Sequence, residues 1–211
     1  MDLNQWLSEH YRVIPGTPNI IAGVDRPQLA QWFKEWGLNS GVEVGTYMGK
    51  YAEVLCQANP KLRLTCVDPW VAYNGYKDYS TQRSLNKGYE GAKIVAEKYK
   101  CTMVREFSVD AAKQFPDGYF DFVYIDANHE LPWVIQDLYT WIPKVRKGGV
   151  ISGHDYLFGD LCPVLQVVPA VHAYTQANRI KKWYVLGRQR KMTTDARKLP
   201  KYARTWMWIN S

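Results

Sequence analysis

The chain has 211 residues, a size that suits one domain able to bury most of its surface without disulfide bonds or structural metal ions. Four cysteines, Cys56, Cys66, Cys101 and Cys162, lie far apart in the sequence without metal-type pairs, so we interpret them as thiols in a reducing compartment. The first residues lack a basic leader and no window approaches the roughly 20 apolar residues of a membrane span. We therefore expect a soluble cytoplasmic protein without membrane contact.

The net charge of +7 is unevenly distributed. Residues 179–204 contain ten basic residues and one acidic residue, so this stretch carries +9 while the remainder carries −2. A concentrated basic end could attract an anionic acceptor or a nucleic acid. We prefer the simpler interpretation of a solvated loop between the last two strands, because runs of charge usually mark solvated surface.

The predicted elements begin with an N-terminal helical extension over residues 1–24. Its aromatic part, residues 6–11, could cover the site of a second copy, which leaves a homo-oligomer open. Asp25 and Pro27 then cap and open a helix that ends at Gly37. Four further runs predict helices: 51–58, 90–99, 111–115 and 131–141. Seven short apolar or β-branched runs predict strands: 42–45, 62–68, 102–105, 120–126, 149–153, 183–186 and 205–209.

Alternating strands and helices predict an α/β fold, a doubly wound, mostly parallel seven-stranded sheet with helices on both faces. No linker or repeat divides the chain, so we expect a single domain over residues 1–211. Ligands of such sheets bind at the carboxyl ends of the strands. The segment 71–90 is polar and aromatic and follows one of these ends, so it is either a lid or a surface connection with one short helix.

The end of the first strand carries the strongest signal for a ligand. There the sequence reads Glu43-x-Gly45-x-x-x-Gly49, and Asp68 ends the next strand about twenty residues further on. Glycines let the backbone approach a ligand closely, and the carboxylate can accept hydrogen bonds from a ribose. A dinucleotide fingerprint needs a further glycine, and Glu43 would repel a pyrophosphate but suits the ammonium of S-adenosylmethionine. The alternative is an ordinary strand-to-helix turn with a solvent-facing Glu43.

Two later motifs extend this pattern, Tyr124-Ile125-Asp126-x-x-His129 and Gly153-His154-Asp155-Tyr156. From about residue 25 to 156 the chain resembles class I S-adenosylmethionine-dependent methyltransferases, in the branch that contains many small O-methyltransferases. The resemblance implies an antiparallel C-terminal edge of the sheet. It also implies a set of cofactor-binding residues: Glu43, Gly45, Thr46 and Gly49 for the methionyl part, Asp68 for the ribose, Trp70 near the sugar or adenine, Ser108 and Val109 at the adenine, and Asp126 beside the sulfur.

Asp126 and Asp155 end neighbouring strands, with His129 and His154 beside them. In related O-methyltransferases, aspartates at these strand ends hold a divalent metal that lowers the pKa of the acceptor's hydroxyl. The resemblance therefore implies Asp126, His154 and Asp155 as ligands of Mg²⁺ or another divalent cation, although Asn128 and His154 stand where some relatives carry carboxylates. His154 is otherwise a general base or a histidine bonded to backbone. The same alternatives apply to His129, for which we favour a role in orienting the loop after Asp126. We count His154, Asp126 and His129 as catalytic candidates.

These observations predict a methyltransferase acting on the hydroxyl of a small molecule, possible acceptors being sugars, polyketides or catechol-like compounds. A nucleic-acid methyltransferase is the first alternative, but the residues after the fourth strand lack the Pro-Pro-aromatic signature and Cys162 precedes rather than follows Pro163. A non-catalytic cofactor-binding domain is the second, and the clustered titratable residues at 126–155 disfavour it. A nicotinamide oxidoreductase is disfavoured by the spacing of the glycines.

Overall fold

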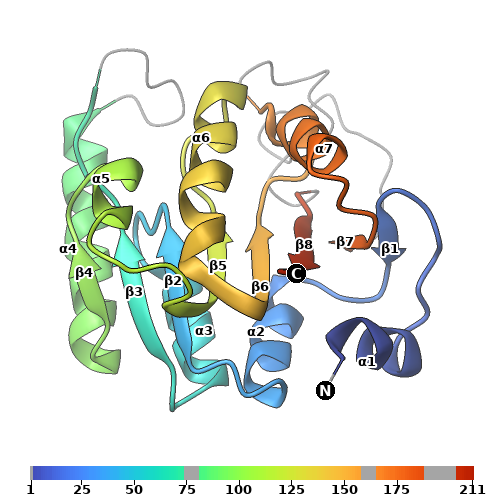
Figure 1. The fold of residues 1–211 in the computed structure, drawn as a ribbon. Helices are drawn as coiled ribbons and strands as arrows, with labels where there is room; N and C mark the ends of the chain where they lie inside the picture. Colours follow the sequence, from blue (N-terminus) through green and yellow to red (C-terminus); the bar gives the residue numbers. More distant parts are fainter. Residues whose placement is uncertain (1, 74–80, 158–164, 188–202) are drawn as a thin grey trace.

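The computed structural model describes residues 2–73, 81–157, 165–187 and 203–211, and Figure 1 shows their arrangement. Eight strands form one sheet in the order β1-β7-β8-β6-β5-β2-β3-β4. β8 is antiparallel to β6 and β7, and the other neighbours are parallel. The strands are β1 (Asn19–Ile21), β2 (Ser40–Val44), β3 (Arg63–Val67), β4 (Thr102–Val104), β5 (Phe120–Ile125), β6 (Val145–Gly153), β7 (Trp183–Leu186) and β8 (Thr205–Ile209).

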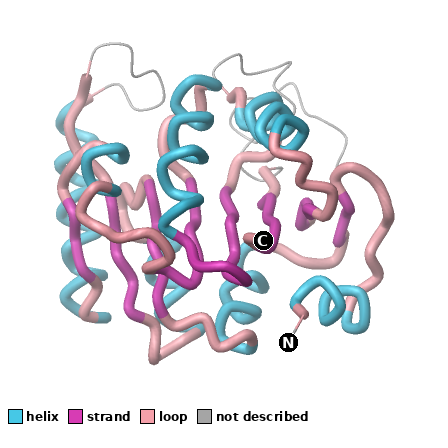
Figure 2. Tube along the Cα trace, in the orientation of Figure 1, coloured by secondary structure: helices cyan, strands magenta, loops and turns pink. Residues whose placement is uncertain are grey.

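Helices cover both faces of the sheet, which lies as a central layer in Figure 2. The helices are α1 (Leu3–His10), α2 (Arg26–Glu35), α3 (Lys50–Ala58), α4 (Gln82–Tyr99), α5 (Ser108–Ala112), α6 (Leu131–Trp141), the 3-10 helix η1 (Ile142–Lys144) and α7 (Val167–Ala177). One core lies between the sheet and α1 to α4, and the other between the sheet and α5 to α7. None of the described helices has the length and apolar character needed to cross a bilayer.

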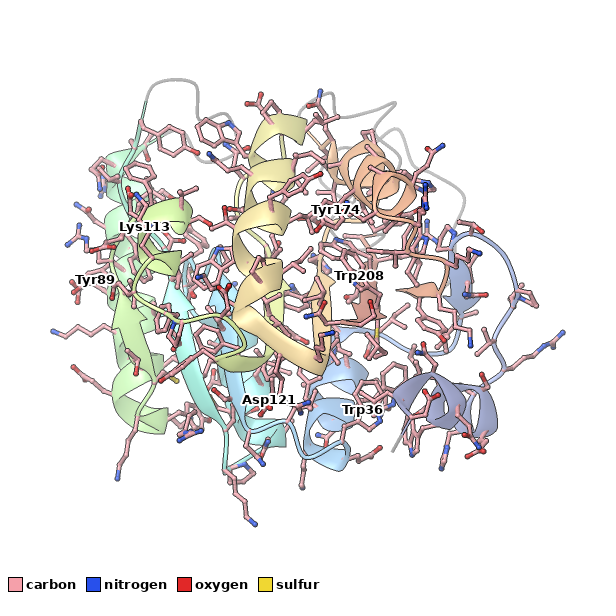
Figure 3. The ribbon with its side chains drawn as sticks, in the orientation of Figure 1. Trp36, Tyr89, Lys113, Asp121, Tyr174 and Trp208 are labelled. Atoms are coloured by element: carbon pink, nitrogen blue, oxygen red, sulfur yellow. The ribbon has the colours of Figure 1, made fainter. Side chains whose placement is uncertain are left out.

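The central strands are mostly apolar because parallel strands between two helical layers are buried on both faces. In β5, Phe122 and Tyr124 point into the first core, whereas Val123 and Ile125 point into the second. Figure 3 labels Tyr174 of α7 and Trp208 of β8, whose rings stack with centroids 6.1 Å apart. The antiparallel edge is thus tied to the second core by aromatic packing.

The predicted fold class is confirmed, including the antiparallel C-terminal edge, but the sheet has an eighth strand. β1 has only three residues and pairs with β7, more than 160 positions away, so no local pattern indicates it. α7 was also not predicted. α4 begins at Gln82 rather than at residue 90, so the second half of the segment 71–90 is helical.

Several predicted features lie wholly or partly outside the described residues. Residues 74–80 of the expected lid, Cys162, and residues 188–202 of the basic stretch are among them. The other three cysteines are free thiols. Cys56 on α3 and Cys101 before β4, distant in the sequence, come together with their sulfur atoms 3.6 Å apart.

Candidate active site

Strand register explains why the predicted site residues meet. Val67, Val44, Ile125 and Gly153 are successive partners across β3, β2, β5 and β6, so the residues that follow them emerge side by side at one edge of the sheet. β2 lies between β5 and β3, where the strand order reverses, and sheets of this kind bind ligands at that point. The residues that emerge there are Asp68, Gly45, Asp126 and His154.

A cavity of about 480 Å³ opens at this edge. Ten of the twelve sequence-predicted site residues line it: Glu43, Gly45, Thr46, Asp68, Ser108, Val109, Asp126, His129, His154 and Asp155. The two that do not line it are Gly49 and Trp70. The structure thus brings together candidates that span more than 110 positions of the sequence.

Gly45 forms the tight turn after β2. Its φ is +92°, and a Cβ on this residue would lie 2.2 Å from the carbonyl oxygen of Asp126, so no side chain fits. Gly49 (φ +74°) instead precedes α3, where an added Cβ would come within 3.2 Å of Ala92 Cα in α4. Gly45 therefore permits the turn after β2 to lie close against the backbone that follows β5, whereas Gly49 permits the packing of α3 against α4.

Asp68 holds the loops that follow β2 and β3. Its two carboxylate oxygens accept hydrogen bonds from the backbone N–H groups of Tyr47 (3.0 Å) and Trp70 (2.7 Å). Burial raises the pKa of Asp68, and these two hydrogen bonds oppose the rise. Trp70 is fully buried, and its indole donates to the carbonyl of Tyr47 at 2.8 Å. Trp70 thus supports the loop from beneath the cavity.

Glu43 is a buried carboxylate at the cavity wall. Its side chain is 2% exposed, and Oε2 has no hydrogen-bond partner among the described residues. Burial raises the pKa of Glu43 well above its usual range. A buried, incompletely paired carboxylate is costly unless a donor or cation approaches it. Glu43 is therefore suited to receive a positively charged group of a ligand.

Asp126, His129, His154 and Asp155 form a compact group, here called the His-Asp cluster. His129 Nε2 lies 2.8 Å from Asp155 Oδ2 and 3.4 Å from Asp126 Oδ1. His154 Nδ1 lies 3.2 Å from Asp155 Oδ1 and 4.0 Å from Asp126 Oδ2. Arg26 Nη1 adds a positive charge 3.5 Å from Asp126 Oδ2. Asp155 is thus shared by the two imidazoles.

Asp155 has an unusual backbone for a residue with a side chain, with φ at +50°. Aspartate tolerates this conformation better than most residues, and here it turns the carboxylate toward both histidines. Burial would raise the pKa of Asp155, but hydrogen bonds from His129 and His154 outweigh it and hold that pKa well below its usual range. Asp155 is consequently an anion that orients the imidazoles.

The cluster also has the geometry of a cation site. Asp126, His154 and Asp155 each offer one ligand atom, and these atoms lie within 4.8 Å of one another. Carboxylates with an imidazole suit divalent transition metals such as Mn²⁺, Fe²⁺ or Zn²⁺ better than Mg²⁺, which prefers oxygen ligands alone.

Asp137 on α6 also lines the cavity, and sequence reasoning missed it. Its carboxylate accepts a hydrogen bond from the Ser108 hydroxyl, which in turn accepts one from the Trp141 indole at 2.8 Å. Burial raises the pKa of Asp137 to about 7, although the Ser108 hydrogen bond opposes this. Nothing in the helical pattern of residues 131–141 distinguishes this aspartate from a solvated one.

Asp137 should make stability depend on pH. Its pKa in the folded protein exceeds its usual value, so between pH 4 and 7 the folded state binds more protons and the free energy of unfolding falls as pH rises. Asp137→Asn removes this loss and should stabilise the protein by about 1–4 kcal/mol at pH 8, with little gain at pH 4. Urea unfolding at both pH values measures this.

Asp110→Asn on α5 is the matched control, since that side chain is exposed and its loss should change stability by less than about 0.5 kcal/mol. An equal effect of Asp137→Asn at pH 4 and pH 8 would contradict the assignment of a proton to Asp137.

Aromatic side chains line the mouth of the cavity. The Tyr73 ring meets Phe107 and Trp133 edge-on, with centroids 5.4 Å and 6.0 Å apart. Its hydroxyl accepts a hydrogen bond from Asn128 Nδ2 at 2.8 Å, which connects the loops after β3 and β5. Phe107 and Trp133 are 45% and 41% exposed, so the mouth presents apolar surface to solvent.

Fold and site together define a class of protein: an α/β protein whose cavity, at the switch point of the sheet, suits a ligand with a positively charged group. Comparison with protein families gives the identity. Residues 42–156 match the model of the methyltransferase domain family. The chain belongs to this family and is a class I S-adenosylmethionine-dependent methyltransferase.

Individual relatives are distant. The uncharacterized protein R132 of Acanthamoeba polyphaga mimivirus is 26% identical over 136 residues, and the match covers 62% of this chain but only 57% of that protein. An O-methyltransferase from Bacillus cereus in complex with SAH has a TM-score of 0.60 at 15% identity, covering 98% of this chain and 87% of that one. The O-methyltransferase TomG from Streptomyces achromogenes, in complex with SAM, has a TM-score of 0.58 at 17% identity, with 88% and 79% covered. At these identities the likeness shows the fold alone.

Proposed function

We propose that this methyltransferase acts on a hydroxyl group of a small molecule, and that the His-Asp cluster accepts the hydroxyl proton. The observation that carries the proposal is the cluster itself, which stands in the same cavity as Glu43 and Gly45. The names of the two structural neighbours, both O-methyltransferases, support the same reaction class.

The residues present fit the cofactor. Gly45 lets the turn after β2 lie close against the backbone of Asp126 at the cavity, and the Glu43 carboxylate offers an open oxygen to the methionyl ammonium. Asp68 lines the same cavity, where ribose hydroxyls would donate to it. Ser108, Val109 and Asp137 line the same cavity and would border the adenine. When bound, S-adenosylmethionine supplies a methyl group on a sulfonium sulfur, and the carbon–sulfur electron pair stays on the thioether after transfer.

The chain's own residues align the acceptor and remove its proton. His154 Nδ1 faces Asp155, so the imidazole is oriented to donate through Nδ1 and to accept a proton at Nε2. Asp155 then stabilises the positive charge that the imidazole acquires, and the Arg26 guanidinium lies 3.5 Å from Asp126 nearby. General base catalysis of this kind contributes about 10²–10⁴-fold to a rate.

A divalent cation on Asp126, His154 and Asp155 is the second arrangement that the cluster allows. It would lower the pKa of a bound hydroxyl and so replace the imidazole as the means of deprotonation. Activity in the presence of EDTA, compared with activity after adding back Mg²⁺ or Mn²⁺, distinguishes the two.

Ligand-induced shifts in melting temperature test the class of cofactor. S-adenosylhomocysteine (SAH) should raise the melting temperature of the wild-type protein and NAD should not, since only ligands of the native state stabilise it. A shift with NAD alone would refute the proposed function. Radiolabelled methyl transfer to a panel of hydroxylated small molecules, with total RNA and DNA as additional acceptors, then tests the reaction.

Glu43→Gln separates cofactor binding from folding. The substitution keeps the shape of the side chain but removes the charge, so the Kd for SAH should rise about 10- to 100-fold. The melting temperature of the unliganded protein should stay the same or rise, because a buried carboxylate is replaced by a neutral amide. Calorimetric titration and thermal unfolding measure the two. An unchanged Kd would remove Glu43 from the binding site.

A further inference from the structure

A second cavity of about 230 Å³ adjoins the active-site cavity, and Arg26 and His154 line both. Its other walls come from the start of α2, the end of β7 and the residues that enter β8. β8 runs antiparallel to β6, so its first residues lie at the same edge of the sheet as the His-Asp cluster. The lining residues used below are Asp25, Arg26, His154, Gly187 and Arg204.

Arg204 is the unusual residue of this cavity. It is only 7% exposed, and its guanidinium makes no hydrogen bond or ion pair with any residue in the described part of the chain. Its one described interaction is with the face of the Tyr156 ring, 5.1 Å from the centroid. Burial lowers the pKa of Arg204, as expected for a cation without a nearby carboxylate. A buried cation of this kind is costly unless an anion joins it.

The surroundings hold Arg204 in place. Gly187 has a φ of +109°, and a Cβ there would come within 3.3 Å of Arg204 Cγ, so this glycine makes room for the arginine stem. The backbone carbonyl of Arg204 accepts a hydrogen bond from the Tyr156 N–H at 3.0 Å, which ties the arginine to the segment after Asp155. The stem and the backbone of Arg204 are therefore both in contact with neighbouring segments where the residue lines the cavity.

The other charged groups around this cavity leave an excess of positive charge. Arg26 contributes a second guanidinium, which also contacts Asp126 at 3.5 Å. Asp25 is the one carboxylate in the lining, and it is exposed and accepts the Gln28 N–H at 3.1 Å as the cap of α2. Two arginines thus face one carboxylate that is already engaged.

We propose that this second cavity binds an oxyanion of the methyl acceptor, so that the acceptor is a hydroxylated molecule carrying a carboxylate or a phosphate. The inference rests on the proposed function and specifies its substrate class. A guanidinium presents paired N–H donors that match the two oxygens of such a group. An acceptor anchored at Arg204 would extend past His154, which lies in both cavities, and place its hydroxyl at the His-Asp cluster.

Anion binding to the SAH-loaded protein tests the proposal directly. At matched ionic strength, benzoate or inorganic phosphate should raise the melting temperature above the value in chloride, and Arg204→Gln should remove that gain. The stronger probe identifies a carboxylate or a phosphate as the group bound. Arg63→Gln is the control, because Arg63 is exposed at the start of β3, the end of that strand away from the cavities. This variant should retain the full gain in melting temperature. Arg204→Lys keeps the positive charge but lacks the planar guanidinium, so this variant should retain part of the anion-dependent rise in melting temperature.

Methyl transfer gives the second readout. 4-Hydroxybenzoate, 3-hydroxybutyrate and 4-hydroxyphenyl phosphate are compared with the methyl esters of the two acids and with 4-methoxyphenol. The kcat/KM for at least one anionic acceptor should exceed that for its neutral analogue by about tenfold or more, and Arg204→Gln should abolish this preference. SAH affinity of Arg204→Gln should match the wild type, which shows that the variant is folded.

The outcomes separate this inference from the proposed function. If SAH binds to the wild-type protein but no anion stabilises it beyond chloride, or if Arg204→Gln keeps the full gain, the oxyanion site is refuted while the methyltransferase assignment stands. Equal transfer to acids and their neutral partners refutes it as well. Failure of the wild type to bind SAH would instead overturn the proposed function.

Discussion

Asp155→Asn is expected to lower kcat by about 10²–10⁴-fold, the range that loss of an oriented general base produces. The carboxylate of Asp155 lies 2.8 Å from His129 Nε2 and 3.2 Å from His154 Nδ1. An amide would present an N–H to one of these nitrogens and would not stabilise a charged imidazole. The Kd for SAH should change less than about twofold, because Asp155 lies beyond the groups assigned to the cofactor. Single-turnover methyl transfer and calorimetric titration measure the two quantities.

Asp117→Asn is the matched control for this experiment. Asp117 is an exposed carboxylate that pairs with Lys144 at 2.8 Å, away from the cavity, and its loss should leave kcat unchanged. Wild-type activity that disappears in EDTA and returns with Mn²⁺ would assign Asp155 as a metal ligand. Full activity of Asp155→Asn would refute both roles of the cluster.

Gly45→Ala is expected to destabilise the protein by about 3 kcal/mol or more and to abolish SAH binding. The added methyl group would lie 2.2 Å from the carbonyl oxygen of Asp126 and 2.5 Å from Ala127 Cα, both backbone atoms that cannot rotate away. Separating β2 from β5 would also shift Asp126 out of the His-Asp cluster. Urea unfolding and SAH titration give the two measurements.

Two other glycines dissect this effect. Gly23→Ala meets no atom within 4 Å and has no positive φ, so it should be neutral or slightly stabilising. Gly37→Ala also meets no atom, but its φ is +69°, so it should show the cost of the backbone conformation alone, about 1 kcal/mol. The loss in free energy of unfolding caused by Gly45→Ala should be larger than that of either control. A loss no larger than that of Gly37→Ala would mean that the turn adapts and that close approach of the strands is not required.

Much of the site could be predicted because its signals are local. Each residue that emerges at the active edge directly follows a short apolar strand, so the glycine spacing of 45–49 and the acids at 68, 126 and 155 could be identified without knowledge of strand order. Register then makes these ends neighbours automatically, since the strands are parallel and in step. Ser108 and Val109, which the family resemblance proposes for the adenine, lie four and five residues after the end of β4 and line the same cavity.

The residues that were missed depend on long-range packing. Asp137 differs from a solvated helical aspartate only because α6 packs it against Ser108 and Trp141. Arg204 lies within the basic stretch that we interpreted from composition as a solvated loop. In the structure it immediately precedes β8 and is buried beside Tyr156. Gly49 and Trp70 lie in the loops after β2 and β3, as predicted, but outside the cavity. Gly49 permits the packing of α3 against α4, and the Trp70 indole donates to the carbonyl of Tyr47.

The sequence by itself determined the α/β class, the family, and the edge of the sheet at which the cavity opens, because apolar runs and turn residues encode strands and their ends locally. Tertiary structure alone decided which charges are desolvated: Glu43, Asp137 and Arg204 acquire their character from burial, and burial is a property of what packs around a residue. It also decided the eighth strand, which enters the sheet by pairing with β7, and the second cavity, whose walls meet only in the folded chain.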